Sequence, residues 1–124
     1  MRYRSNFEAE VGRALYERGV DFKYEPDKIP FQPKPRVYIP DFYVPDNDFY
    51  IEVKGRLIQS DRVKHVLIKE QNPDLEVKFL FQNARQKIYK GSKTTYADWA
   101  ERYGFEWSEK KLQTEWFNER WYWK

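Results

Sequence analysis

The sequence predicts one domain, residues 1–124, with a mixed α/β fold, that is, an α+β arrangement in which helices flank a mixed sheet. Three observations predict it: a capped amphipathic segment opens the chain, two strand-like segments follow around a turn, and a helix–strand–helix order comes last. With 124 residues the chain has the length of one domain of ordinary size, so we do not expect a two-domain enzyme.

Residues 5–19 predict the first helix. Ser5 and Glu8 stand three positions apart, as in a capping box, and Gly19 supplies a stop. The apolar residues between these signals recur at helical spacing: Phe7, Val11, Ala14 and Leu15.

A stiff connection is expected after this helix. Residues 20–25 first predict a short strand. Six of the seven prolines then fall in residues 26–45, and proline cannot donate the hydrogen bonds of an inner strand. We therefore expect residues 26–37 to be extended and stiff.

A β-hairpin is predicted next. Residues 38–44 and 49–54 are rich in aromatic and β-branched side chains, and the Pro-Asp-Asn-Asp sequence between them is typical of a turn. The remaining predicted elements are a helix over residues 61–71, a strand over residues 76–82 and a helix from Thr95 to Gly104.

The hairpin places chemistry-bearing residues together. If the turn is centred between Asp46 and Asn47, Asp41 faces Glu52, and directly opposed residues have Cβ atoms about 4.5–5.5 Å apart. Period-two alternation puts Lys54 on the face of Glu52. The same alternation sends the intervening residues to the other face, as core: Phe49, Ile51 and Val53.

Two opposed carboxylates repel each other unless a cation or a proton lies between them. The chain has no Cys and a single His, which excludes thiolate zinc sites and histidine clusters, so oxygen ligands for Mg²⁺ or Mn²⁺ fit best. Such an ion with an adjacent lysine suits phosphodiester hydrolysis. The alternative is a surface ladder of ion pairs, and spacing alone does not decide between them.

The order Pro40-Asp41, then Glu52-Val53-Lys54, resembles the PD-(D/E)xK nuclease signature. The flanking segments are similar to those of the phage endonuclease I family of Holliday-junction resolvases. The matching segments cover most of the chain: Arg4-Ser5 with Glu8, Tyr38-Ile39-Pro40-Asp41-Phe42, Glu52-Val53-Lys54-Gly55, Asp61-Arg62, Lys64-His65, Glu70-Gln71 and Ile88-Tyr89-Lys90-Gly91-Ser92.

This resemblance implies a restriction-endonuclease-like fold and a Mg²⁺-dependent endodeoxyribonuclease that cuts branched DNA, with Mn²⁺ as a substitute. Asp41, Glu52 and the backbone carbonyl of Val53 would bind metal, Lys54 would act near the scissile phosphate, and Glu8 would complete the acidic set. It also implies a domain-swapped homodimer, with residues 28–38 as the bridge between subunits, acting in the cytoplasm of the infected host cell.

Glu8 and the basic residues each have a second interpretation. A capping box alone would account for Glu8. Residues 84–93 hold several basic side chains and no acid, which favours phosphate contacts over a merely solvated loop. His65 could contact phosphate, as the resemblance implies, or be an ordinary histidine of a helix. The residues expected to contact DNA are Arg4, Lys64, His65, Arg85, Lys87 and Lys90.

Aromatic residues gather near the end of the chain: Trp116, Phe117, Trp121, Tyr122 and Trp123. They could stack on bases exposed at a junction, but clustered rings more often pack against the protein or a partner subunit, and we expect packing.

Three function classes remain open after the resemblance and the composition are considered together. A net charge of +3 permits a nucleic-acid partner without requiring one, and the sequence has neither a membrane-spanning stretch nor a signal peptide, so we expect no membrane partner and no secretion. The alternatives to a junction-cutting enzyme are a nuclease for linear or mismatched duplex DNA and a non-catalytic DNA-binding module on the same fold.

Overall fold

The computed structural model describes residues 2–31 and 36–117. The helices are α1 (Asn6–Glu17), α2 (Gln59–Gln71) and α3 (Tyr96–Arg102). The strands are β1 (Lys23–Tyr24), β2 (Ile29–Phe31), β3 (Arg36–Tyr38), β4 (Phe42–Val44), β5 (Phe49–Lys54), β6 (Val77–Phe81) and β7 (Trp107–Glu109).

Within the described residues, five strands form a mixed sheet in the order β1-β4-β5-β6-β7. Strand β4 pairs antiparallel with β1 and β5, whereas β6 pairs parallel with β5 and β7. Parallel neighbours need a crossover, and α2 and α3 supply the two crossovers. The predicted α/β fold, a mixed sheet flanked by helices, is therefore confirmed.

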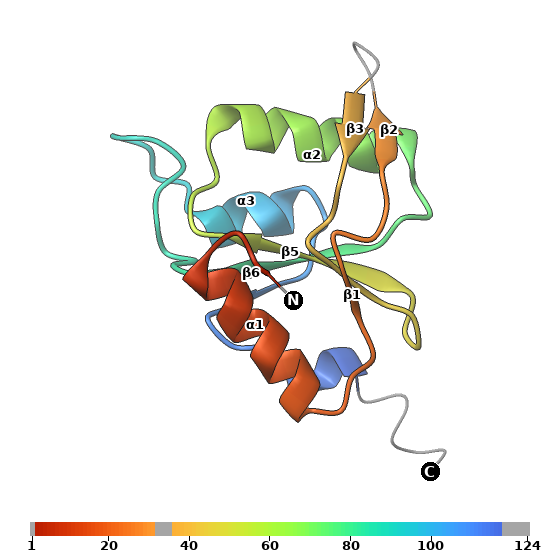
Figure 1. Ribbon diagram of the computed structural model, residues 1–124. Helices are drawn as coiled ribbons and strands as arrows, with labels where there is room; N and C mark the ends of the chain where they lie inside the picture. The colour runs from red at the N-terminus through yellow and green to blue at the C-terminus, as the bar shows by residue number, and fades with distance from the viewer. Residues whose placement is uncertain (1, 32–35, 118–124) are drawn as a thin grey trace.

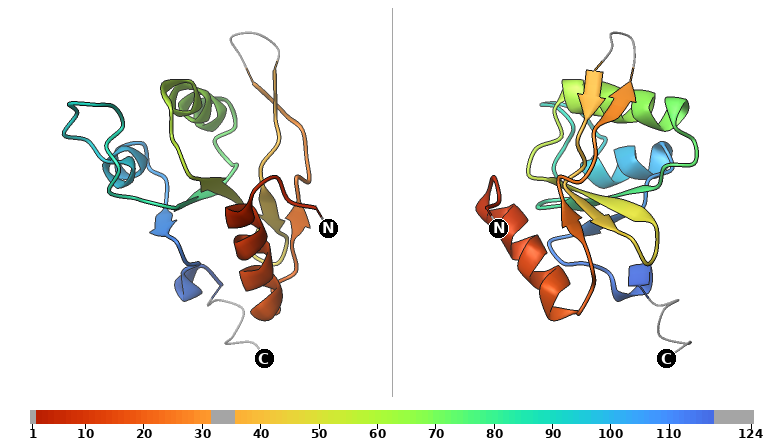
Figure 2. Two further views of the ribbon diagram at one scale, coloured as in Figure 1. Left: turned by 60° about the vertical axis from the view of Figure 1, so that its left-hand side comes forward. Right: turned by 45° about the vertical axis from the view of Figure 1, so that its right-hand side comes forward.

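The sheet separates two apolar clusters. Helices α2 and α3 lie on one side of it and α1 on the other (Figures 1 and 2). Side chains of β6 alternate between them: Phe79 and Phe81 join the α2/α3 cluster, and Leu80 joins the α1 cluster. The small β2–β3 sheet adds Ile29, Phe31 and Tyr38 to the α2/α3 side.

Local signals define the helix ends as predicted. The Ser5 Oγ accepts a hydrogen bond from the Glu8 backbone N–H at 3.0 Å, which caps α1. Thr95 and Asp98 form a reciprocal capping box at the start of α3. Gly19 and Gly104 follow helices with φ values of +71° and +79°, the left-handed conformation that glycine adopts without strain.

Three predictions for residues 20–44 are corrected: two strands and the connection between them. Only Lys23–Tyr24 of residues 20–25 is paired. Residues 26–37 are not simply an extended connection, because β2 and β3 pair with each other antiparallel. The predicted strand 38–44 is divided, with Tyr38 in β3 and only Phe42–Val44 in β4.

Proline explains these corrections. Pro30 lies in β2, which belongs to a two-stranded sheet rather than to the inner strands of the main one, so its missing N–H is tolerated. Pro40 falls between β3 and β4, at the point where the chain passes from the small sheet to the large one.

Strand β7 has no counterpart in the sequence predictions. Beyond it, Trp116 and Phe117 are 8% and 5% exposed and pack against Phe49, which confirms the packing expected of these two rings. Trp121, Tyr122 and Trp123 lie outside the described residues. None of the helices described is long and apolar enough to cross a membrane.

Candidate active site

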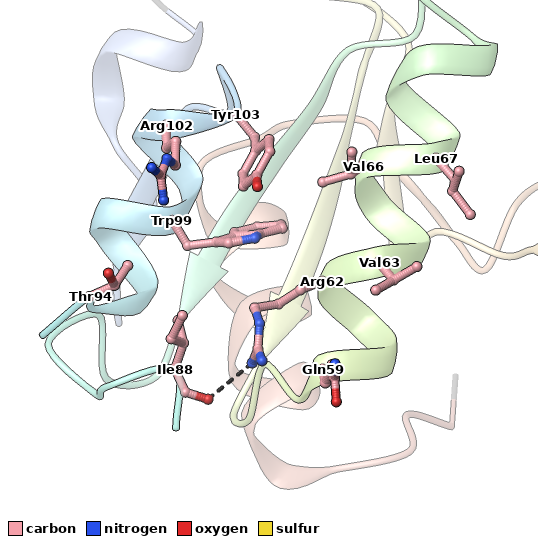
Figure 3. Close-up of a pocket in the computed structure, with 10 residues that line it drawn as sticks. All are labelled: Gln59, Arg62, Val63, Val66, Leu67, Ile88, Thr94, Trp99, Arg102 and Tyr103. Carbon is pink, nitrogen blue, oxygen red and sulfur yellow. Dashed lines mark hydrogen bonds between the residues drawn. The ribbon is translucent and has the colours of Figure 1, made fainter. Parts of the chain in front are cut away.

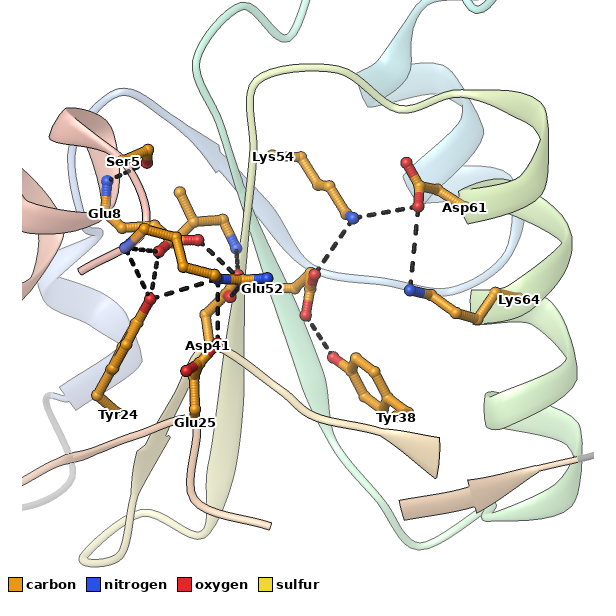
Figure 4. Close-up of polar contacts among 12 residues, drawn as sticks. Ser5, Glu8, Tyr24, Glu25, Tyr38, Asp41, Glu52, Lys54, Asp61 and Lys64 are labelled. Atoms are coloured by element: carbon orange, nitrogen blue, oxygen red, sulfur yellow. Dashed lines mark hydrogen bonds and ion pairs between the residues drawn. The ribbon is translucent and has the colours of Figure 1, made fainter. Parts of the chain in front are cut away.

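The candidate site lies at the end of β5, between the first turns of α1 and α2 (Figure 4). The β4–β5 ladder pairs Val44 with Phe49 and Phe42 with Ile51, which confirms the predicted register. Asp41 directly precedes β4, and Glu52 lies within β5 just past its ladder with β4, so the two carboxylates lie beside each other on neighbouring strands.

One half of the site joins α1 to the start of β4. The Asp41 Oδ2 accepts a hydrogen bond from the Val53 N–H at 2.8 Å, and its Oδ1 lies 2.6 Å from the Arg4 Nη2. The same Arg4 nitrogen lies 3.1 Å from the Glu8 Oε2. The Tyr24 hydroxyl donates to the other oxygen of Glu8 at 2.5 Å.

Asp41 is buried among like charges. Its burial, followed by the negative charges of Glu52 and Glu8, raises the pKa of Asp41 to about 8, although the Val53 N–H and Arg4 act in the opposite direction. Because burial is the largest cause of the raised pKa, a cation placed beside Asp41 would stabilise its ionised form. A divalent cation is suited to such a place.

The other half of the site joins β5 to α2. The Glu52 Oε1 accepts a hydrogen bond from the buried Tyr38 hydroxyl at 2.6 Å. Its Oε2 lies 3.3 Å from the Lys54 Nζ, which is also 3.4 Å from an Asp61 oxygen. Lys54 and Glu52 therefore share a face of β5, as predicted.

Lys54 is held in its charged form. Burial lowers the pKa of its ammonium group, but the carboxylates of Glu52 and Asp61 outweigh burial, and the pKa is raised above its usual value. The side chain is 13% exposed, so the charge is fixed near the surface rather than free in solvent.

The predicted metal ligands are near one another but not assembled around a single point. Across residues 2–31 and 36–117, no three Asp, Glu or His side chains are arranged to share an ion. Arg4 lies between Asp41 and Glu8, and Tyr38 with Lys54 holds Glu52. Oxygen ligands alone are nevertheless the set that Mg²⁺ or Mn²⁺ prefers.

His65 is placed in the core, which corrects its predicted contact with phosphate. Its side chain is 1% exposed and packs edge-on against Tyr38 and Phe79. Neither ring nitrogen has a hydrogen-bond partner among the described residues, and the Nε2 lies 3.9 Å from the Glu52 Oε2. The helix turns this ring toward the sheet while its neighbour Lys64 stays half-exposed.

Replacing His65 by Leu should make stability less sensitive to acid. Burial, with the charges of Lys54 and Lys64, lowers the pKa of His65 well below its usual value, so only the unfolded chain takes up this proton. The wild type should therefore lose up to about 1.4 kcal/mol per pH unit below about pH 6.5, relative to the variant. Urea unfolding at pH 7.0, 6.0 and 5.5 measures this difference.

Carboxylates such as Asp41 titrate in both proteins and cancel in the difference. If the unfolding free energies of wild type and His65→Leu change equally between pH 7.0 and 5.5, the pKa of His65 is not lowered by folding.

The loop between β6 and α3 carries the predicted basic residues at the surface. Arg85, Lys87 and Lys90 are all exposed and make no ion pair with any carboxylate among the described residues. A cleft of about 620 Å³ runs from Gly55, directly after Lys54, to this loop. Lys87 and Lys90 line it, as does Arg56, which the sequence interpretation did not include.

Three site residues were missed as functional positions. Tyr24 holds Glu8, Tyr38 holds Glu52, and Asp61 pairs with Lys54. Tyr38 and Asp61 belong to segments that resemble the endonuclease family, which was a signal for them. Tyr24 lies 16 residues from Glu8, and no local pattern links the two.

With this geometry in place, comparison with known proteins defines the class of the protein. The sequence model of the family described as Phage endonuclease I matches residues 1–122. The chain belongs to this family, and it is a nuclease.

Individual relatives agree with the family assignment. The chain is 38% identical to Endonuclease I of Escherichia phage T7 over 119 residues, which cover 94% of this chain and 79% of the relative. It is 40% identical to Endodeoxyribonuclease 1 of Enterobacteria phage T3 over 112 residues, which cover 89% of this chain and 73% of the relative.

Proposed function

We propose that the protein is a metal-dependent, structure-selective endodeoxyribonuclease that hydrolyses phosphodiester bonds in branched DNA and resolves Holliday junctions. The observation that supports this most is the buried Asp41 at the strand end beside Glu52 and Lys54, next to a cleft lined by basic residues. The family assignment supports the nuclease chemistry independently. The cytoplasm of the infected host cell is the corresponding place of action.

Mg²⁺, or Mn²⁺ in its place, would be held by Asp41, Glu52 and the Val53 carbonyl, with Glu8 completing the acidic set. Bound there, the ion would supply Lewis-acid activation of a water molecule and neutralise phosphate charge. The burial of Asp41 and its raised pKa support the fit, because a nearby cation would stabilise its ionised form.

Neighbouring side chains hold Glu52 and Lys54 in position for the reaction. The hydrogen bond from Tyr38 fixes one oxygen of Glu52, leaving the other facing Lys54. The Lys54 ammonium, kept charged by Glu52 and Asp61, is available to stabilise negative charge that develops on the scissile phosphate.

Paired cuts in a junction need two sites, and a homodimer would supply them. In the single chain, α1 places Glu8 beside Asp41 through Arg4. The same contacts made between two chains, with residues 28–38 as the bridge, would define a domain-swapped dimer. Analytical ultracentrifugation of the purified protein tests the dimer.

Cleavage of matched substrates tests the proposed function. Purified protein is incubated with a four-way junction and with a linear duplex of the same sequence, each with Mg²⁺, Mn²⁺ or EDTA. We expect paired nicks in the junction, with either metal and not with EDTA. Preference for the linear duplex would indicate a different nuclease substrate, and metal-independent binding without cleavage would indicate a DNA-binding module.

Arg62 is expected to support DNA binding indirectly, by holding the basic loop. Its Nη1 donates to the Leu57 carbonyl at 2.8 Å and to the Ile88 carbonyl at 3.0 Å, and so ties the segment after β5 to the loop. Figure 3 shows the bond to Ile88. Arg62→Ala should weaken junction binding by about 3- to 10-fold, because removing both bonds frees the loop. Fluorescence anisotropy in EDTA measures this affinity.

Arg102→Ala is the matched control. Arg62 and Arg102 both line a groove of about 370 Å³ between α2 and α3 (Figure 3). Among the described residues, the Arg62 side chain bonds to the loop at Ile88 and the Arg102 side chain does not. Equal loss of affinity in both variants would mean that charge in the groove, and not the tie to Ile88, determines binding.

A further inference from the structure

We propose that Arg4 is an exchangeable counter-cation of the metal site: its guanidinium neutralises Glu8 and Asp41 in the metal-free protein and is displaced by the divalent ion. The proposal rests on the metal-dependent function proposed above. It assigns Arg4 a role at the metal ligands, in addition to the DNA contact expected from the sequence.

One nitrogen of Arg4 has the position of a bridging cation. The Nη2 lies 2.6 Å from the Asp41 Oδ1 and 3.1 Å from the Glu8 Oε2, and thereby joins carboxylates that come from α1 and from the residue directly before β4. The Nε lies 3.0 Å from Glu25. A single guanidinium therefore balances three acidic groups.

Among the residues that the structure describes, the oxygens that face Arg4 accept from no other donor. The second oxygen of Asp41 is held by the Val53 N–H, and the second oxygen of Glu8 is held by the Tyr24 hydroxyl and the Arg4 N–H. If the guanidinium leaves, both carboxylates keep these other hydrogen bonds. Each then presents one free oxygen toward the place that Arg4 occupied.

Exposure makes the exchange feasible. The Arg4 side chain is 61% exposed, whereas the side chains of Asp41 and Glu8 are 1% and 9% exposed. The cation therefore reaches inward from the surface onto buried acids, and it can swing back into solvent without disturbing the core. A released guanidinium presents paired N–H donors that match a DNA phosphate.

Mn²⁺ binding without DNA tests the proposal. Isothermal titration calorimetry should show that Arg4→Gln binds Mn²⁺ about 3- to 10-fold more tightly than wild type, because the ion no longer competes with the guanidinium. Arg13→Gln removes the same charge from an exposed position of α1 and should bind as wild type does. Equal or weaker binding by Arg4→Gln than by wild type would overturn the proposal.

The outcome also separates this proposal from the proposed function. If folded wild type and Arg4→Gln both bind no Mn²⁺, the exchange and the metal-dependent function fail together. If wild type binds and Arg4→Gln gains nothing, only the exchange fails.

A second measurement does not depend on the folding of an Arg4 variant. In ¹⁵N-labelled wild type, the side-chain Nε–H resonance of Arg4 should move on Mg²⁺ titration, because a displaced guanidinium also leaves the pair of its Nε with Glu25. A resonance that stays fixed while Mg²⁺ binds would show that the guanidinium keeps its pair with Glu25 and is not displaced, and would overturn the proposal.

Discussion

Asp41→Asn is expected to lower the rate of junction cleavage by at least about 1,000-fold, a loss of about 4 kcal/mol of transition-state stabilisation. The carboxamide can still accept the Val53 N–H, so the strand end keeps its shape. It carries no charge, however, and cannot hold a divalent ion as a buried carboxylate does. Single-turnover cleavage of a labelled junction in Mg²⁺ measures the rate.

The variant is expected to fold. Its buried amide removes a negative charge that burial and the neighbouring acids Glu52 and Glu8 disfavour, which offsets the lost pair with Arg4. Asp74→Asn, at an exposed turn position, is the matched control and should cut at the wild-type rate. Unchanged cutting by Asp41→Asn would reject the proposed site.

Phe79→Ala is expected to lower the free energy of unfolding by about 3–5 kcal/mol, a large share of the stability of an ordinary domain. Phe79 is fully buried in β6, an inner strand that lies between β5 and β7. Its ring contacts residues of α2, β6, α3 and the segment after α3, namely His65, Phe81, Trp99 and Phe105, at centroid distances of 4.9, 5.5, 5.6 and 5.0 Å. Removing it leaves a cavity on the α2/α3 side of the sheet.

Urea unfolding followed by circular dichroism measures this loss. Tyr89→Ala removes an aromatic ring that is 60% exposed, and it should change stability by no more than about 0.5 kcal/mol. A similar effect from both substitutions would contradict the assignment of Phe79 to the centre of the core.

Local signals made much of the fold predictable. The bounds of β5 and its register with β4 follow from alternation and from turn residues that lie next to the strands. The Ser5 cap and Gly19 likewise define α1 from within a few positions of its ends. Each of these features depends on residues close in sequence.

Other parts depended on contacts that no local pattern encodes. The pairing of Ile29 with Tyr38 is set by packing against α2, and the prolines hid it. Strand β7 has three residues, too few to establish an alternation. His65 was expected to contact phosphate because its segment resembles the endonuclease family, whereas the helix turns its ring into the core.

The candidate site likewise has features that follow from local patterns and features that depend on long-range contacts. The shared face of Glu52 and Lys54 follows from the period of a strand. The pair between Arg4 and Asp41 joins residues that are 37 positions apart, so only the folded chain reveals it. The resemblance to a family implied which carboxylates would bind metal, but it did not show which groups balance their charge.

Mutations on the two faces of β5 should affect different properties of the protein, stability on one face and activity on the other. Phe49, Ile51 and Val53 belong to the α1 cluster, while Glu52 and Lys54 face the Tyr38 hydroxyl and Asp61. Directed evolution for thermal tolerance and directed evolution for turnover should therefore select alternate codons of one short segment. Insertion of a single codon within it would exchange the two roles and disable both.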